Sequence, residues 1–179
     1  GDLDGYRASV GLRGSFTENF EGLIKANYVD SDDFDGDFTG TLGAQYKFSN
    51  RAQVYANWTR GFRSGGYNFR ITNVAVFNRA FAATGNLFFD EEKVDNYEIG
   101  GKFQTDDGSF TLNAAAYITK VGNMQREVNL ADPGAGVVQN ILNTADATIV
   151  GFEAEARMRV SESLAFTANL GIIDAQYDR

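Results

Sequence analysis

The sequence predicts an all-β protein, specifically an antiparallel transmembrane β-barrel segment of about eight strands. Three observations carry this prediction. Apolar and polar residues alternate in about eight runs of about ten residues each, the length that a tilted strand needs to cross a bilayer. Charged residues gather on one face of these runs. The connections between the runs alternate between short and long.

The clearest alternation lies in residues 148–160. Val150, Phe152 and Ala154 fall on one face there, because successive side chains of a strand point to opposite sides. The opposite face carries Glu153, Glu155, Arg157 and Arg159. Runs of the same kind cover residues 6–16, 24–28, 38–48, 54–62, 96–103, 110–119 and 164–172. We expect a strand at each of these places.

Charge placement separates the two faces. On the apolar faces the sole charge we count is Arg60, near a strand end. An Arg facing lipid costs about 2–4 kcal/mol at the midplane and about 0–1 kcal/mol near the interface, so this position is tolerable. The polar faces carry the four charges of residues 153–159 together with Arg7, Arg13, Lys25, Lys47, Glu98 and Lys102. We interpret the four as lumen-facing ion pairs formed with adjacent strands.

Connection lengths predict two different rims. The short turns are residues 17–19, 49–51, 105–108 and 161–163, and the long segments are 30–37, 61–93 and 122–145. Short turns on one rim and long loops on the other are typical of outer-membrane barrels. Aromatic residues near the short turns predict an interfacial girdle: Phe16, Phe20, Phe48, Tyr55, Phe103, Phe110 and Phe166.

Both ends of the chain should then lie at the long-loop rim, which is the wrong place for a complete small barrel. We expect an open sheet with residues 6–16 at one edge and 164–172 at the other. A soluble sandwich or barrel also alternates. Strands in soluble proteins average about 5–6 residues, however, and the aromatic rim is also unlike them.

Composition excludes several classes of function. The 179 residues include no His and no Cys, and the formal net charge is −8. The chain therefore lacks the commonest general base, thiolate ligands and disulfides, and its charge disfavours nucleic acid. We predict no enzyme activity, catalytic residue, metal site or cofactor. No apolar run is long enough for a transmembrane helix, and the opening Gly1-Asp2-Leu3-Asp4 is not a signal peptide.

The long segments are where we expect binding residues. The acidic run at 30–37 departs from the EF-hand pattern because Phe34 occupies the fifth position, so we interpret it as a solvated loop. Such a loop could still share divalent cations with lipopolysaccharide phosphates.

The other two long segments hold the candidates for ligand contact. Loops on a rigid scaffold commonly carry the residues that bind ligands. The ligand-contact candidates are Tyr67, Asn68, Phe69, Arg70 and Arg126.

Several motifs carry a family resemblance. They read VYANWTRGFRSGGYN at 54–68, EKVDNYEIGGK at 92–102, AAAY at 114–117, MQ at 124–125 and GFEAE at 151–155. These motifs, in this order, closely resemble the barrel of TonB-dependent receptors. One departure is Asp90-Glu91, where the family often has a Pro before the Glu.

The resemblance implies a plugged barrel of about 22 strands that imports scarce nutrients, most commonly iron–siderophore complexes. Residues 1–179 would be a partial barrel domain of an outer-membrane receptor, without the plug domain, the TonB box and the remaining strands. Implied partners are outer-membrane lipid and lipopolysaccharide, the receptor's own plug and remaining strands, the inner-membrane TonB complex and a small-molecule ligand. Two alternatives stay open: a small independent barrel acting as anchor or adhesin, and a soluble carbohydrate-binding β-domain.

Overall fold

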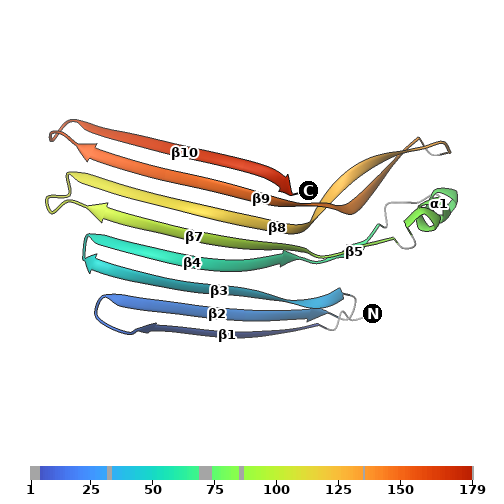
Figure 1. Ribbon diagram of the computed structural model, residues 1–179, viewed down its shortest axis with the longest axis horizontal. Coiled ribbons are helices and arrows are strands. Elements are labelled where there is room, and N and C mark those ends of the chain that lie inside the picture. Colours follow the sequence, from blue (N-terminus) through green and yellow to red (C-terminus); the bar gives the residue numbers. More distant parts are fainter. Residues whose placement is uncertain (1–4, 32–33, 69–73, 85–86, 135, 179) are drawn as a thin grey trace.

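The alternating runs form one antiparallel sheet of eight strands in the order β1-β2-β3-β4-β7-β8-β9-β10 (Figure 1). The computed structural model describes residues 5–31, 34–68, 74–84, 87–134 and 136–178. The sheet strands are β1 (Gly5–Ser15), β2 (Phe20–Ser31), β3 (Phe34–Ser49), β4 (Ala52–Arg63), β7 (Glu92–Gln104), β8 (Phe110–Asp132), β9 (Gly136–Arg159) and β10 (Ala165–Asp178). A two-stranded sheet, β5 (Gly66–Tyr67) with β6 (Phe88–Phe89), and the helix α1 (Val74–Thr84) lie outside it.

Register places apolar residues beside apolar residues across the sheet. Ala154 of β9, for example, stands opposite Ala114 of β8 on one side and Leu170 of β10 on the other. This apolar face is open: Leu12, Ile99 and Ile172 are 69%, 63% and 59% exposed. Among the described residues, the buried apolar side chains are Val76, Val121 and Ala147 alone. The sheet therefore has no core of its own, which is unlike a soluble sandwich.

The two edges of the sheet do not meet. In the part of the chain that the structure describes, β1 pairs with β2 alone and β10 pairs with β9 alone. Each edge strand thus presents a row of backbone N–H and C=O groups with no partner strand. The expected open sheet is confirmed, and these eight strands do not close into a small barrel.

The two rims differ as expected. The short turns lie at one end of the sheet, and the connections 61–93 and 122–145 lie at the other, where β10 also ends (Figure 1). The long connections contain more regular structure than the sequence indicated. Residues 122–145 continue β8 and β9 as a long hairpin, and residues 61–93 hold β5, α1 and β6. These connections adopt regular structure because it pairs their backbone N–H and C=O groups. The third expected long loop, 30–37, was wrong, because β2 runs to Ser31 and β3 begins at Phe34.

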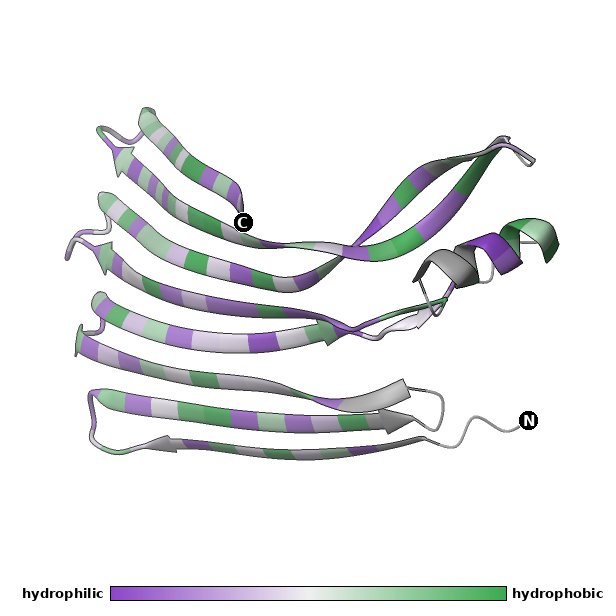
Figure 2. Cartoon of the chain, turned by 45° about the vertical axis from the view of Figure 1, so that its right-hand side comes forward, coloured by the Kyte–Doolittle hydropathy of each residue, from purple (hydrophilic) through white to green (hydrophobic). Residues whose placement is uncertain are grey.

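The helix α1 was missed by the sequence analysis. Val74, Phe77 and Phe81 recur at the three- and four-residue spacing of one helix face, a signal that could have found it. Figure 2 shows α1 projecting beyond the sheet on the side of the β8–β9 hairpin. Of the helices that the structure describes, none combines the length and apolar character needed to cross a membrane.

Aromatic rings cluster at the short-turn rim. The ring centroids of Phe16 and Phe20 are 5.5 Å apart, and those of Phe103 and Phe110 are 6.4 Å apart. Tyr55 does not belong to this girdle, contrary to the sequence-based assignment. It lies on the polar face, where it lines a hollow with Gln53 and Lys102. Successive side chains of a strand point to opposite faces, so Tyr55 points away from the apolar face that carries Val54.

Arg60, a charged residue on the apolar face, is paired with a carboxylate on the same face. Arg60 stands opposite Asp95 of β7, and its Nε and Nη2 donate to the Asp95 carboxylate at 2.8 and 2.6 Å. Trp58 Nε1 donates to the same carboxylate at 2.9 Å. The sequence analysis counted Arg60 as alone on this face, but Asp95 shares it. Pairing lowers the cost of placing both charges beside lipid.

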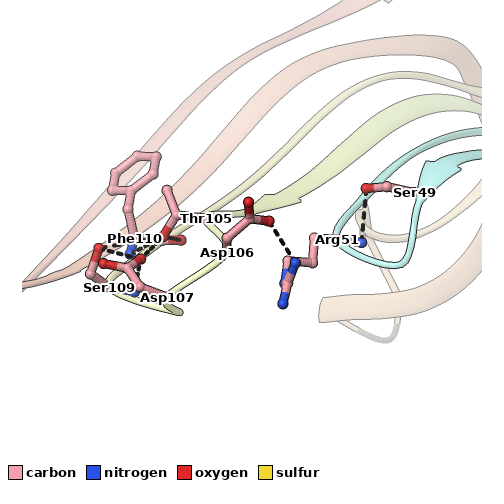
Figure 3. Close-up of polar contacts among 7 residues, drawn as sticks. All are labelled: Ser49, Arg51, Thr105, Asp106, Asp107, Ser109 and Phe110. Carbon is pink, nitrogen blue, oxygen red and sulfur yellow. Dashed lines mark hydrogen bonds and ion pairs between the residues drawn. The ribbon is translucent and has the colours of Figure 1, made fainter.

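The short turns are held by a compact set of polar contacts (Figure 3). The Asp107 carboxylate accepts from Thr105 Oγ1 at 2.7 Å, Ser109 Oγ at 2.8 Å and Ser109 N at 3.0 Å. Gly108 follows with φ +67°, a left-handed conformation that suits glycine. Arg51 Nη1, in the neighbouring turn, lies 2.5 Å from Asp106 Oδ1 and links the two turns.

These contacts predict an acid-sensitive turn. The Thr105 hydroxyl, followed by the Ser109 amide and hydroxyl, lowers the pKa of Asp107 from 3.8 to about 2. A lowered pKa means that the stabilisation is complete above the ordinary value and is lost as pH falls through about 2. Titration of the Asp107 carboxylate by NMR in micelles should show a midpoint near 2, with loss of the Ser109 amide contact at that pH. A midpoint near 4 would contradict the turn geometry.

The two faces should differ in their tolerance of charge. Leu170→Arg places a cation on the apolar face, whereas Asn169→Arg places the same cation one residue away on the polar face. We expect the first variant to destabilise the full-length protein in bilayers by about 2–4 kcal/mol and the second to have little effect. The measurement is the urea dependence of folding into vesicles. Equal tolerance would indicate that water contacts both faces.

Candidate functional site

The polar face carries an ion-pair cluster near the short-turn rim. Glu21 of β2 lies between two cations: Arg13 Nη2 is 3.2 Å from Glu21 Oε2, and Lys47 Nζ is 2.9 Å from Glu21 Oε1. Gln45 Nε2 donates to Glu21 Oε2 at 3.0 Å. The cluster joins β1, β2 and β3. Both cations were expected on this face, whereas Glu21 was missed, although period-two spacing from Lys25 places it there.

The charges of β9 behave differently from the prediction. The residues that stand opposite Glu153 are Ala115 and Gly171, and those opposite Glu155 are Asn113 and Asn169. Over the described residues, no ion pair includes Glu153, Glu155, Arg157 or Arg159. The expected pairing with adjacent strands was therefore wrong, because the adjacent strands offer small or uncharged side chains at these positions.

Two tyrosines lie flat against the polar face. Tyr55 covers Gly100 of the next strand, where an added Cβ would lie 2.5 Å from the ring, and Tyr117 covers Gly151 in the same way. Both pairs are cross-strand neighbours. Glycine permits this close approach because it has no Cβ. A shallow hollow nearby is lined by Tyr55, Lys102, Asn113, Glu153, Glu155 and Asn169.

At the long-connection rim, the structure places the candidate binding residues on separate elements. Tyr67 of β5 is half-exposed, and its ring lies 4.4 Å from that of Phe88 of β6. Arg126 of β8 is exposed, and its guanidinium lies 5.1 Å over the ring of Tyr177 of β10. Phe69 and Arg70 lie outside the described residues.

Asn68 is occupied by contacts within the protein. Its side chain is buried, Nδ2 donates to Ile141 O at 2.9 Å, and Oδ1 accepts from Ile141 N at 2.7 Å. The acidic run at 30–37 lies mostly outside the residues whose side chains are described. Its last member, Asp37, has Oδ2 3.3 Å from Lys93 Nζ. Within the described ranges, no group of three or more acidic residues is placed to hold a metal ion.

Sequence reasoning missed three side-chain amides at this rim: Gln125 and Asn140, which are buried, and Asn143, which is partly exposed. Gln125 and Asn140 are 7% and 6% exposed, although both lie on a hairpin that extends beyond the sheet. The Met124-Gln125 motif was noted but was assigned no role. Gln125 lies at a register shift of the β8–β9 pair, and such a shift becomes visible only once the two strands have paired.

Comparison with known proteins gives a consistent result. Residues 2–178 match the family described as TonB dependent receptor-like, beta-barrel. The pesticin receptor of Yersinia pestis is 27% identical over 143 residues, which cover 80% of this chain and 19% of that protein. The chain thus spans about a fifth of the length of this curated relative.

Two solved structures share the fold. The ferric yersiniabactin uptake receptor FyuA from Yersinia pestis superposes with a TM-score of 0.72 at 21% identity, covering 98% of this chain and 27% of that one. The siderophore receptor PirA from Pseudomonas aeruginosa gives a TM-score of 0.74 at 16% identity, covering 97% and 32%. Together with the family match over nearly every residue, the open sheet and its two unlike faces lead to one conclusion. This chain belongs to the TonB-dependent receptor family, as part of an outer-membrane β-barrel.

Proposed function

We propose that this chain forms part of the wall and outer rim of a receptor that imports a ferric siderophore complex by TonB-coupled transport. The observation that carries the proposal is the contrast between the two faces of the sheet. One face exposes large apolar side chains and neutralises its Arg60 with Asp95. The other exposes a row of charges on β9. A wall between lipid and an aqueous or protein-filled lumen needs this contrast.

The charged row supports a wide, filled barrel. Glu153, Glu155, Arg157 and Arg159 have no ion-pair partner in the described part of the sheet. Packing four such charges into a narrow interior would be costly, because a buried charge needs a partner. A wide lumen with water or a plug domain removes that cost. We infer that the receptor's own plug and remaining strands face these residues, and that the inner-membrane TonB complex acts on the plug.

The ligand proposal rests on the relatives and on the rim. The two similar structures are those of a ferric yersiniabactin uptake receptor and a siderophore receptor. Tyr67 of β5 and Arg126 of β8 offer an exposed ring and an exposed guanidinium at this rim, and Phe69 and Arg70 remain candidates from the sequence. Aromatic rings stack on apolar ligands, and guanidinium groups pair with carboxylates. The apolar face contacts outer-membrane lipid, with lipopolysaccharide at this rim.

The alternatives find less support. An independent anchor or adhesin barrel requires β1 to pair with β10, and each of them has a single partner strand in the described residues. A soluble carbohydrate-binding domain requires a buried apolar core, whereas the apolar face is open along its length.

Uptake assays in whole cells test the proposal. The full-length receptor is expressed in a Gram-negative host that lacks its own siderophore receptors, and cells receive a panel of ferric siderophores labelled with radioactive iron, including ferric yersiniabactin. We expect at least one complex to accumulate in cells with TonB and not in isogenic cells without it. Accumulation independent of TonB, or binding of no panel member, would contradict the proposal.

A matched pair of variants locates the ligand. Arg126→Ala at the outer rim should weaken binding by about tenfold, as expected for loss of a ligand-facing guanidinium. Arg51→Ala removes the same side chain at the opposite rim and should leave the affinity unchanged. Equal effects of both variants would show that Arg126 has no special part in binding.

A further inference from the structure

One side chain ties together both ends of the long β4–β7 connection. Gln125 of β8 donates from Nε2 to Ser64 O and to Asp90 O, each at 2.9 Å. Ser64 directly follows β4, and Asp90 directly follows β6. The two carbonyl groups therefore lie near the start and near the end of the β4–β7 connection. Gln125 Oε1 accepts from Arg63 Nε at 2.6 Å. Both polar atoms of the buried Gln125 amide are therefore hydrogen-bonded where the two ends of the connection come together, which we call its neck.

Asn143 strengthens the same attachment from the facing strand. It is the register partner of Gln125 in the β8–β9 hairpin. Its Oδ1 accepts from Asp90 N at 2.7 Å, and its Nδ2 donates to Asp90 O at 2.9 Å and to Asn123 O at 2.7 Å. Asp90 O thus receives hydrogen bonds from two amides, one on each strand of the hairpin.

Asn68 supplies a third contact farther from the sheet. Its amide bonds to both backbone groups of Ile141, as a neighbouring strand would, and its own N–H donates to Leu87 O at 2.9 Å. The connection is therefore attached to the hairpin near its neck and again beside the β5–β6 pair. We call Gln125, Asn143 and Asn68 the amide clasp.

The chemistry of the amide clasp suits a permanent attachment. Apart from the Arg63 contact, its side chains bond to backbone groups: Gln125 and Asn143 to those of the connection, and Asn68 to those of the hairpin. Buried amides that lose these partners leave carbonyls and N–H groups unsatisfied, which is unfavourable. The strand ladders do not need the clasp. What it orders is the β5–β6 pair, with the half-exposed rings of Tyr67 and Phe88.

We propose that the amide clasp joins the two described ends of the β4–β7 connection, residues 64–68 and 87–91, to the β8–β9 hairpin as one rigid body, so that these segments move together and not as independent loops. The Tyr67–Phe88 pair then has a set position relative to the hairpin. This inference concerns the free receptor and is independent of what the receptor transports.

Spin-label distances in the full-length receptor, reconstituted in nanodiscs without ligand, test the inference. Nitroxide labels are placed on cysteines at Phe88 of β6 and Val137 of β9, two exposed positions in a chain that contains no native Cys. The unmodified clasp should give a single narrow distance distribution. Gln125→Met removes the amide at nearly constant volume and should at least double the width of the distribution. Hydrogen exchange at Asp90 N should accelerate by about tenfold.

The controls separate loop attachment from general unfolding. Asn129→Leu removes an exposed amide from the same strand and should leave the distribution narrow. A second label pair within β7 and β8 near the short turns should be unaffected by Gln125→Met. If Gln125→Met does not fold, Asn143→Ala and Asn68→Ala carry the same test. A narrow distribution and unchanged exchange in the folded clasp variants would overturn the inference.

Discussion

Backbone hydrogen bonding inside a hydrocarbon layer is the constraint on which the other features of this structure depend. Lipid offers no donors or acceptors, so each N–H and C=O within the layer must find a partner in another strand. Six of the eight sheet strands satisfy this condition on both sides. Strands β1 and β10 satisfy it on one side each within the described residues. Further strands of the same barrel are the natural partners of these two edges, in keeping with a chain that spans a fraction of its relatives.

The same environment explains the placement of charge. On the apolar face, Arg60 and Asp95 come together with Trp58 near the outer end of the strands, so that neither charge faces lipid unpaired. On the polar face, Glu21 neutralises Arg13 and Lys47 near the short turns, whereas the charges of β9 remain without partners in the sheet. The apolar face therefore pairs the facing charges of β4 and β7, whereas the polar face leaves the charges of β9 unpaired among the described residues.

Beyond the sheet, different interactions take over. The β8–β9 hairpin continues the ladder after a change of register near Asn123, which has φ 53°. The described ends of the neighbouring connection are held by side-chain amides that bond to its backbone. There, side-chain amides supply the backbone hydrogen bonds that neighbouring strands supply within the layer. Aromatic and charged residues such as Tyr67 and Arg126 can then be displayed on an ordered rim.

Local sequence was sufficient for much of this architecture. Period-two alternation, as in Glu153–Arg159 against Val150 and Phe152, located the eight strands and assigned their faces, because a strand exposes its side chains strictly in turn. Connection lengths separated the rims. The partners of individual charges depended on register, which brings Asp95 beside Arg60 and leaves Glu155 between two asparagines. The burial of Gln125 and Asn68 depended on two segments far apart in the chain meeting at one rim. No local pattern encodes such a meeting, since it arises only when the strands between these segments have paired.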